Sequence, residues 1–376
     1  MTPSTSSKLF ASLLVVLCST RLYANGCYSS ILSFGDSIAD TGNLKQLATI
    51  YDDVQFPCGP PYGQNFIGQS TGRCSNGRLI IDFLAESLGL PLVPSYFSFM
   101  GSGNQVASRH GMNYAIAGST AMDSSFVEAR CRESAVINGS LGVQLAWFKK
   151  SLPFICGNIT SLDCRNFIGR SLILMGEIGG NDYNIPLSHG KSIDMVRSYV
   201  PLVIDTIVST LNVLIEMGAR TLVVPGNFPV GCFPSYLTIE VSGLSGREEY
   251  DPITGCLTKL NELSEYHNKM LQTKLNKIQE LNPNVVVIYA DYYNAAMQIY
   301  YSPNEYGFTN ETTLKACCGC GGPFNYNATA RCGDASTILC DEPDKYVSWD
   351  GVHLTEAAYK QIFKSIFQGP YTTPEF

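Results

Sequence analysis

Three residues of this chain carry the side chains that a nucleophilic hydrolase needs. Ser37 follows a short apolar segment, residues 30–34, and Asp350 and His353 stand three positions apart near the other end of the chain. Serine is a poor nucleophile near neutral pH, so a neighbouring imidazole must accept its proton and an acid must orient that imidazole. These residue types therefore predict a Ser-His-Asp catalytic triad.

Each of the three residues also fits an ordinary structural role. A serine in a Gly-Asp-Ser turn commonly hydrogen bonds to nearby backbone, and Asp350 before Gly351 suits a turn or a cap. A lone histidine usually lies at the surface or is satisfied by its neighbours. Of the four histidines, however, only His353 has an acid at a short spacing on a predicted loop. That spacing favours the catalytic interpretation, because the acid can fix the imidazole tautomer.

A larger framework must position these residues, and apolar runs that alternate with helical patterns predict a parallel α/β sheet. The runs are mostly continuous, as expected for strands that helices cover on both faces. The expected strands are 31–34, 112–117, 172–175, 221–224 and 285–289, and the expected helices include 193–217, 257–281 and a final helix that Thr355 caps. Ser37 then lies past the carboxyl end of the first strand, where open α/β sheets bind ligands.

Three long segments lack a clear helical or strand pattern, namely residues 55–76, 236–252 and 301–346. Loops of this length in a compact domain usually border a functional site. The chain shows no internal repeat and no linker. We therefore predict one domain with elaborated loops, of which 55–76 and 236–252 shape the pocket.

The sequence around Ser37 and His353 resembles the plant GDSL esterase/lipase family of the SGNH hydrolase superfamily. Gly35-Asp36-Ser37 matches the first block, with Ile38 in place of the usual leucine, and Asp350-x-x-His353 matches the last. Two further blocks stand between them in the right order, Gly111-Met112-Asn113-Tyr114-Ala115-Ile116-Ala117-Gly118-Ser119 and Gly179-Gly180-Asn181-Asp182. Four ordered blocks are far more specific than a Gly-Asp-Ser triplet alone.

The resemblance implies a three-layer α/β/α sandwich with a central parallel five-stranded sheet, similar to flavodoxin. It also implies that Ser37 attacks an ester carbonyl, and that the Ser37 N–H, the Gly118 N–H and Asn181 Nδ2 bind the developing oxyanion. No metal ion or organic cofactor is implied. The polar residues expected to hold these loops, without a catalytic role, are Asp40, Asn43 and Asp182.

The plant branch is matched further by Pro60-Pro61-Tyr62-Gly63, by residues 77–83 and by Cys317-Cys318-Gly319. Residues 316–333 are most similar to members that act on esters of small secondary metabolites, the acetylajmalan esterase-like and sinapine esterase-like enzymes. We therefore expect a serine esterase for acetyl or aromatic-acyl esters of such metabolites. Three alternatives stay open: an acyltransferase with the same triad, a hydrolase of lipid or polysaccharide esters, and a secreted binding protein without activity.

The first 24 residues have the pattern of a secretory signal peptide. Lys8 precedes the apolar run 9–18, and cleavage is expected near Ala24, which leaves one hydrolase domain over residues 25–376. No later segment looks long and apolar enough to span a bilayer. We predict secretion to the apoplast, with the vacuole as the other destination.

Cysteine content fits an oxidising compartment. The chain has 14 cysteines, and one of them, Cys18, is lost with the signal peptide. Cys58 and Cys74 flank one loop, and Cys156 and Cys164 bracket another. Disulfides are favoured over a zinc site in the crowded segment that contains Cys317, Cys318, Cys320, Cys332 and Cys340. Cys320 is the expected unpaired thiol.

Four acceptor sequons for N-glycosylation fit the same compartment, at Asn138, Asn158, Asn310 and Asn327. The net charge of −7 becomes −9 once Lys8 and Arg21 leave with the signal peptide. A negative surface without basic runs argues against nucleic acid and anionic membranes as partners. The expected partner is a small-molecule ester, and the expected assembly is a monomer.

Overall fold

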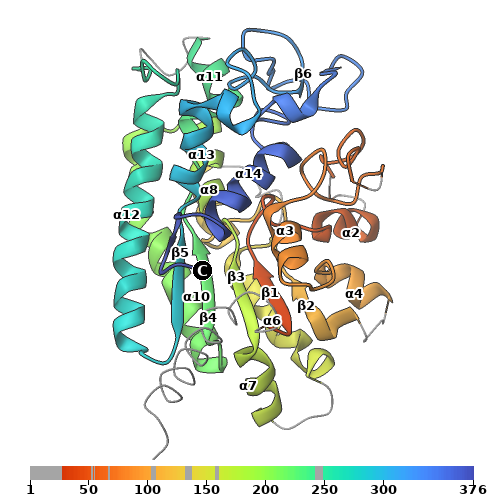
Figure 1. Ribbon diagram of the computed structural model, residues 1–376, viewed down its shortest axis with the longest axis vertical. Helices are drawn as coiled ribbons and strands as arrows, with labels where there is room; N and C mark the ends of the chain where they lie inside the picture. Colours follow the sequence, from red (N-terminus) through yellow and green to blue (C-terminus); the bar gives the residue numbers. More distant parts are fainter. Residues whose placement is uncertain are drawn as a thin grey trace, which may run out of the picture.

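The computed structural model describes residues 28–51, 54, 56–66, 68–102, 107–131, 138–156, 161–241 and 249–376 (Figure 1). Its central sheet has the strand order β2-β1-β3-β4-β5-β8. The strands are β1 (Ser30–Phe34), β2 (Gly111–Asn113), β3 (Ser171–Met175), β4 (Thr221–Pro225), β5 (Val286–Ala290) and β8 (Thr372–Thr373). The first five are parallel, as expected, and the short β8 adds an antiparallel edge.

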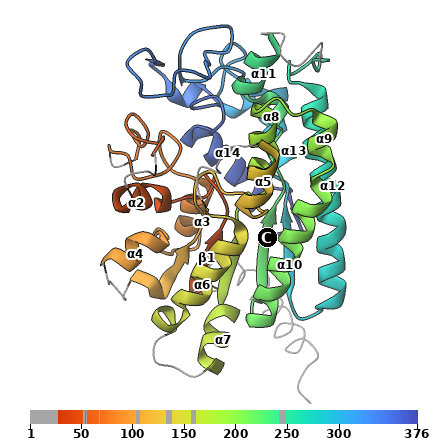
Figure 2. The same ribbon diagram turned by 180° about the vertical axis from the view of Figure 1, so that it is seen from behind.

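Helices cover both faces of this sheet, which confirms the three-layer α/β/α architecture (Figures 1 and 2). The α-helices are α2 (Asn43–Ile50), α3 (Ile80–Ser87), α4 (Tyr96–Ser102), α5 (Ser124–Cys131), α6 (Leu141–Ile155), α7 (Ser161–Gly169), α8 (Gly180–Ser188), α9 (Ile193–Arg197), α10 (Val200–Met217), α11 (Pro234–Val241), α12 (Thr258–Leu281), α13 (Tyr292–Tyr301) and α14 (Glu356–Phe367). Short 3-10 turns are η1 (Ala107–His110), η2 (Val230–Cys232), η3 (Pro303–Tyr306) and η4 (Pro343–Lys345), and a separate two-stranded ribbon pairs β6 (Cys318–Gly319) with β7 (Ile338–Leu339).

Alternate residues of each strand enter two different cores. Leu172 and Leu174 of β3 pack with α3, α13 and α14, whereas Ile173 and Met175 pack with α6, α10 and α12. All four side chains are buried, because successive side chains of a strand point to opposite faces and helices cover both. This double burial explains why the strands read as continuous apolar runs.

Strand β2 is shorter than the predicted run 112–117. The chain leaves the sheet after Asn113, although Tyr114 N–H still donates to Ser33 O at 2.7 Å. Asn43 Nδ2 donates hydrogen bonds to the carbonyl oxygens of Asn113 and Ala115, at 2.8 and 2.7 Å. A side chain therefore replaces the neighbouring strand at this edge of the sheet.

The predicted helix 193–217 is in fact two helices, α9 and α10. Pro201 stands in the first turn of α10. At that position its missing N–H removes no hydrogen bond, but a proline in the middle of one continuous helix would remove a backbone hydrogen bond and break the helix. Contrary to the sequence-based expectation, 193–217 is long and apolar enough to cross a membrane, the one such stretch among the described residues. Val203, Ile207 and Leu211 are nevertheless buried in the core, as in the core helix of a globular protein.

The predicted loop 236–252 is also corrected in part. Residues 236–241 belong to helix α11, and residues 242–248 lie outside the described residues. In contrast, the described residues 56–66 and 68–76 of the first predicted loop, and much of 301–346, are irregular as expected. The expected signal peptide, residues 1–24, lies outside the described residues as well.

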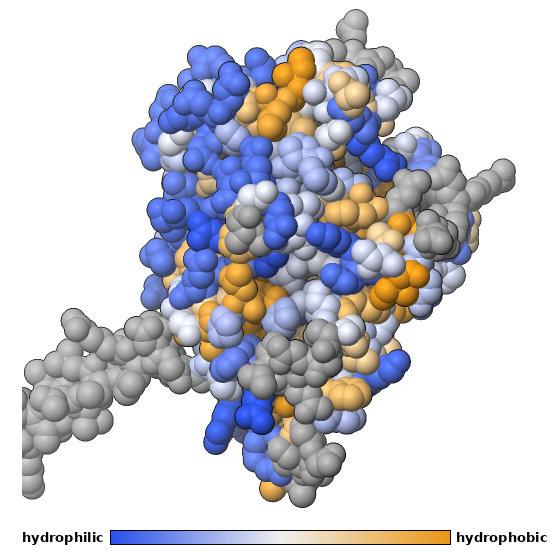
Figure 3. All heavy atoms as spheres, turned by 90° about the vertical axis from the view of Figure 1, so that its right-hand side faces the viewer, coloured by the Kyte–Doolittle hydropathy of each residue, from blue (hydrophilic) through white to orange (hydrophobic). Residues whose placement is uncertain are grey.

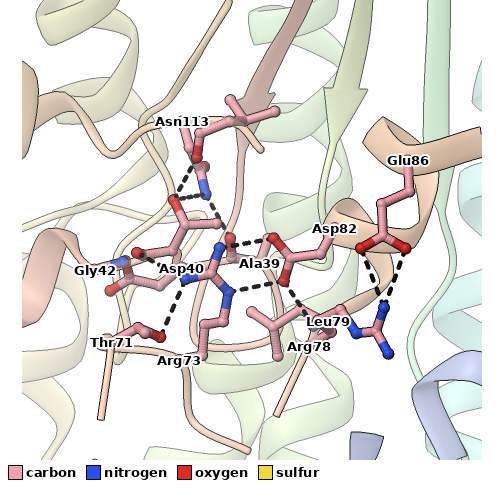
Figure 4. A network of polar contacts seen from close by, with 12 residues as sticks. Ala39, Asp40, Gly42, Thr71, Arg73, Arg78, Leu79, Asp82, Glu86 and Asn113 are labelled. Carbon is pink, nitrogen blue, oxygen red and sulfur yellow. Dashed lines mark hydrogen bonds and ion pairs between the residues drawn. The ribbon is translucent and has the colours of Figure 1, made fainter. Parts of the chain in front are cut away.

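A buried ion pair fixes the loop that precedes α3 (Figure 4). Arg73 forms two 2.7 Å hydrogen bonds with the Asp82 carboxylate, and both side chains are almost fully buried. Arg73 also donates to Thr71 Oγ1 at 3.1 Å and to Thr41 O at 3.4 Å. Removal of either partner would leave an uncompensated buried charge, which is strongly destabilising. The pair therefore ties residues 70–76 to the segment after β1.

Five disulfides join described residues: Cys58–Cys74, Cys156–Cys164, Cys232–Cys256, Cys317–Cys340 and Cys318–Cys332. The first two confirm the expected loop closures. Disulfides also occupy the crowded segment, and within it Cys320 is unpaired, as predicted.

Candidate active site

The segment that carries Ser37 turns sharply out of β1. Gly35 has a φ of +143°, and a Cβ there would lie 3.0 Å from the carbonyl oxygen of Glu177, so the turn requires glycine. The Gln144 side chain binds both backbone groups of Gly35. The Gly35 N–H donates to Gln144 Oε1 at 2.9 Å, and Gln144 Nε2 donates to the Gly35 carbonyl oxygen at 2.8 Å. Ser37 is 9% exposed at the wall of a pocket.

His353 and Asp350 meet Ser37 across 316 residues of chain. Ser37 Oγ lies 2.8 Å from His353 Nε2, and His353 Nδ1 lies 2.6 Å from Asp350 Oδ2. The loop that holds them precedes α14, and Trp349 N–H donates to His353 O at 2.7 Å within it. The three predicted triad residues are thus linked by hydrogen bonds in the order a nucleophilic hydrolase requires.

The Asp350 carboxylate is surrounded by donors. Oδ1 accepts the N–H groups of Val352 and His353 at 3.0 and 2.7 Å, and Oδ2 accepts His353 Nδ1 and the Tyr62 hydroxyl. Burial alone would raise the pKa of Asp350, but the charge of His353 and the hydrogen bonds from His353 and Val352 lower it below its ordinary value. The group therefore remains an anion beside the imidazole.

The three predicted oxyanion donors lie at the carboxyl ends of neighbouring strands. Gly118, with a φ of +85°, follows β2, and Asn181 lies in the first turn of α8, which follows β3. Both residues line the same pocket as Ser37. Among the described residues, no backbone acceptor pairs with the N–H groups of Ser37 and Gly118.

The polar residues expected to hold these loops do so through hydrogen bonds. Asp40 accepts from the N–H groups of Gly42, Asn43 and Leu44 at the start of α2, and from Ala117 N–H at 2.9 Å beside Gly118. Asp182 accepts from Ala121 and Met122 N–H at 2.7 and 2.9 Å. Burial raises the pKa of Asp182 to about 7.

Sequence reasoning missed a pair of buried carboxyl groups next to Ser37. Asp36 and Glu177 hydrogen bond to each other, and Asn181 Nδ2 donates to Asp36 Oδ2 at 3.2 Å. Burial, followed by the charge of Glu177, raises the pKa of Asp36 well above its usual range. Burial also raises the pKa of Glu177, so both carboxyl groups of the pair resist ionisation. Asp36 stood in the first family block, but nothing in the sequence pointed to Glu177.

The pocket has a volume of about 800 Å³ and contains all five predicted site residues. Its apolar walls come from Ile38, Phe228, Val230 and Phe233, and from the disulfide-bonded segment 326–332. Pro57, Cys58 and Tyr62 of the loop 55–76 line it, as predicted, whereas no described residue of 236–252 does.

Three of the four predicted glycosylation sites are described. Asn138, Asn310 and Asn327 are exposed, and Asn158 lies outside the described residues. Asn327 also lines the pocket, where its Oδ1 accepts from the N–H and hydroxyl of Thr329, both at 2.9 Å.

Comparison with known proteins agrees with this geometry. The model of the GDSL-like lipase/acylhydrolase family matches residues 31–366. The chain belongs to this family. The GDSL esterase/lipase At1g28580 of Arabidopsis thaliana is 52% identical over 349 residues, which cover 93% of this chain and 87% of that protein. GDSL esterase/lipase At1g28640, also from Arabidopsis thaliana, is 48% identical over 99% of this chain and 95% of its own length.

Family membership over nearly the whole chain fixes the class of reaction. This GDSL protein is a carboxylic ester hydrolase. The family model extends from β1 through the loop with Asp350 and His353 into α14, and so spans every residue of the site described above.

Proposed function

We propose that this GDSL esterase hydrolyses acetyl or aromatic-acyl esters of small plant metabolites through a Ser37–His353–Asp350 triad. The observation that carries the proposal is the pair of hydrogen bonds at His353, 2.8 Å to Ser37 Oγ and 2.6 Å to Asp350 Oδ2. A nucleophile, a base and an orienting acid in this order are what acyl transfer needs.

In the first half-reaction, Ser37 Oγ attacks the ester carbonyl carbon while His353 Nε2 accepts the hydroxyl proton. Asp350 stabilises the imidazolium at Nδ1. The carbonyl oxygen becomes an oxyanion and binds the N–H groups of Ser37 and Gly118 and the amide of Asn181. The C–O bond of the ester then breaks, and His353 returns the proton to the departing alcohol.

The second half-reaction repeats these steps with water. His353 Nε2 takes a proton from water, whose oxygen attacks the acyl group on Ser37, and the same donors bind the second oxyanion. Collapse of this intermediate breaks the bond to Ser37 Oγ, which takes back a proton from His353 as the carboxylic acid leaves.

The pocket supports a small substrate. A volume of about 800 Å³ with apolar and aromatic walls falls in the range that suits small-molecule ligands. On the face that carries α2 and α4, hydrophobic residues form small patches separated by hydrophilic ones (Figure 3). This scattered pattern gives no support on that face to a broad lipid-binding surface.

Secretion is part of the same proposal. Five disulfides favour an oxidising compartment, and the exposed sequons Asn138, Asn310 and Asn327 are open to glycosylation. We therefore propose that cleavage near Ala24 releases one glycosylated hydrolase domain, residues 25–376.

Hydrolysis of p-nitrophenyl esters from acetate to palmitate tests this function, with Ser37→Ala as the matched variant. We expect a steep preference for acetate that the variant loses while its thermal unfolding is unchanged. Activity that rises with chain length would favour a lipid ester instead. The acyltransferase alternative would be favoured if an added alcohol yielded ester faster than free acid appeared.

A further inference from the structure

Tyr62 contacts the acid of the catalytic triad from a distant part of the sequence. Its hydroxyl donates to Asp350 Oδ2 at 2.8 Å, and the two residues are 288 positions apart. The tyrosine belongs to the Pro60-Pro61-Tyr62-Gly63 segment, for which the esterase mechanism has no role so far. It is 5% exposed, and its ring packs edge-on against Trp349, the residue before Asp350, with centroids 5.8 Å apart.

The hydroxyl binds the oxygen that matters most for catalysis. Asp350 Oδ2 is also the acceptor of His353 Nδ1 at 2.6 Å, whereas Oδ1 is held by two backbone N–H groups of its own loop. Tyr62 is therefore the one side chain outside residues 350–353 that, among the described residues, hydrogen bonds to this carboxylate. A donor at Oδ2 withdraws charge from the oxygen that stabilises the imidazolium.

Tyr62 remains protonated and can act only as the donor in this contact. Burial, followed by the charge of Asp350 and the hydrogen bond to it, raises the pKa of Tyr62 well above 10. The other titratable groups that act on Tyr62 or Asp350 are Arg331, Tyr326 and Tyr359. The positive charge of Arg331 opposes the shift at Tyr62 without reversing it.

We propose that Tyr62 is a positioning residue of the triad, which acts through Asp350 and sets how strongly the carboxylate stabilises protonated His353. The inference rests on the triad proposed above. Loss of the hydroxyl leaves Asp350 a stronger acceptor at Oδ2, so His353 becomes protonated at higher pH and Ser37 loses its base over a wider acidic range. Loss of the hydroxyl also frees one side of the carboxylate that orients the imidazole.

Tyr62→Phe tests this role because it keeps the ring against Trp349 and removes only the hydroxyl. The probe is a fluorophosphonate, whose rate of reaction with Ser37 is measured against pH, together with hydrolysis of p-nitrophenyl acetate. We expect kcat to fall severalfold with KM unchanged, because without the hydroxyl Asp350 orients the imidazole less firmly. We also expect the acid limb of the labelling profile to move upward by about half a pH unit or more.

Tyr293→Phe is the matched control. Tyr293 also donates to a carboxylate, Glu265 Oε1 at 2.7 Å, but it does so in α13 away from the triad. We expect this variant to keep the parent pH profile even if its thermal stability falls.

Two results would overturn the role of Tyr62. One is a Tyr62→Phe profile that superimposes on that of the parent. The other is a loss of rate that accompanies a loss of thermal stability, while the acid limb of the labelling profile stays at the same pH as in the parent. A tyrosine with a purely structural role would give that pattern. Failure of the triad itself is recognised separately, because the parent would then not be labelled at Ser37 at all.

Discussion

The side-chain amide of Asn181 donates a hydrogen bond of 3.2 Å to Asp36, the residue directly before Ser37. Its second N–H donates to Ser119 O at 2.9 Å, and this shorter bond holds the amide in place. An oxyanion formed on Ser37 must therefore compete with Asp36 for the first N–H. Because burial and the nearby Glu177 raise the pKa of Asp36, it competes less strongly than a solvent-exposed carboxylate would.

Asn181→Ala should remove one oxyanion donor without disturbing the Ser37–His353 contact. We expect kcat for p-nitrophenyl acetate to fall by about 10²–10³ with little change in KM, because the lost hydrogen bond forms mainly in the transition state. Steady-state kinetics of the folded variant measure this. A kcat within a few fold of the parent value would mean that Asn181 is not a donor.

The contribution of Asp182 to stability should decrease as pH rises from about 5 to 7.5. Asp182 has its pKa raised by burial to about 7, and the pKa values of Asp36 and Glu177 are raised in the same direction. Above pH ~4 the unfolded chain loses these protons, whereas the folded protein keeps them until about pH 7 in the case of Asp182. The stabilisation that Asp182 provides is therefore lost over this window. Buried His267, whose pKa is lowered to about 3, contributes with the opposite sign, because the unfolded chain protonates this histidine below pH ~6.5 and the folded protein does not.

The melting temperature measures this effect. We expect the change in melting temperature from pH 5 to pH 7.5 to be more positive in Asp182→Asn than in the parent protein, by a few degrees. The control is Asp205→Asn, which removes an exposed carboxylate paired with Lys274 and should leave the slope unchanged. An Asp182→Asn variant whose melting temperature depends on pH in the same way as that of the parent would contradict the prediction.

A glycan on Asn327 should restrict the size of the substrate, because this exposed residue stands in the pocket wall. Asn327→Gln and Thr329→Ala both remove the sequon by different changes. We expect each to raise kcat/KM severalfold for a bulky aromatic-acyl ester relative to p-nitrophenyl acetate. Asn310→Gln, at an exposed sequon outside the pocket lining, serves as the control and should leave that ratio unchanged.

Mass spectrometry of the peptide with residue 327 establishes whether the site carries a glycan. An occupied site with an unchanged substrate ratio in both variants would contradict a role at the pocket mouth. Equal changes in the Asn310→Gln control would point to a general effect of glycan loss.

The framework was predictable from sequence because burial on both faces leaves long apolar runs, and Ser37 follows the first of them. The errors arose where single residues override such a pattern. Asn43 binds the carbonyl groups of Asn113 and Ala115 and ends β2 early, and Pro201 divides the helix expected over 193–217. Hydrophobic periodicity predicts neither the hydrogen bonds of Asn43 nor the break at Pro201.

The immediate surroundings of the triad were not predictable in the same way. Glu177 reaches Asp36, and Tyr62 reaches Asp350, from segments far away in the sequence, and only the folded chain brings them together. The motif with Tyr62 was visible, but a motif alone does not reveal which carboxylate its hydroxyl will meet.

The most direct test of the account is to locate the adduct of a fluorophosphonate probe on the purified, folded protein by peptide mass spectrometry. We predict a single adduct on Ser37, formed in parallel with the loss of p-nitrophenyl acetate hydrolysis, and no adduct on folded Ser37→Ala. An adduct on another residue, or full hydrolysis by folded Ser37→Ala, would contradict Ser37 as the nucleophile.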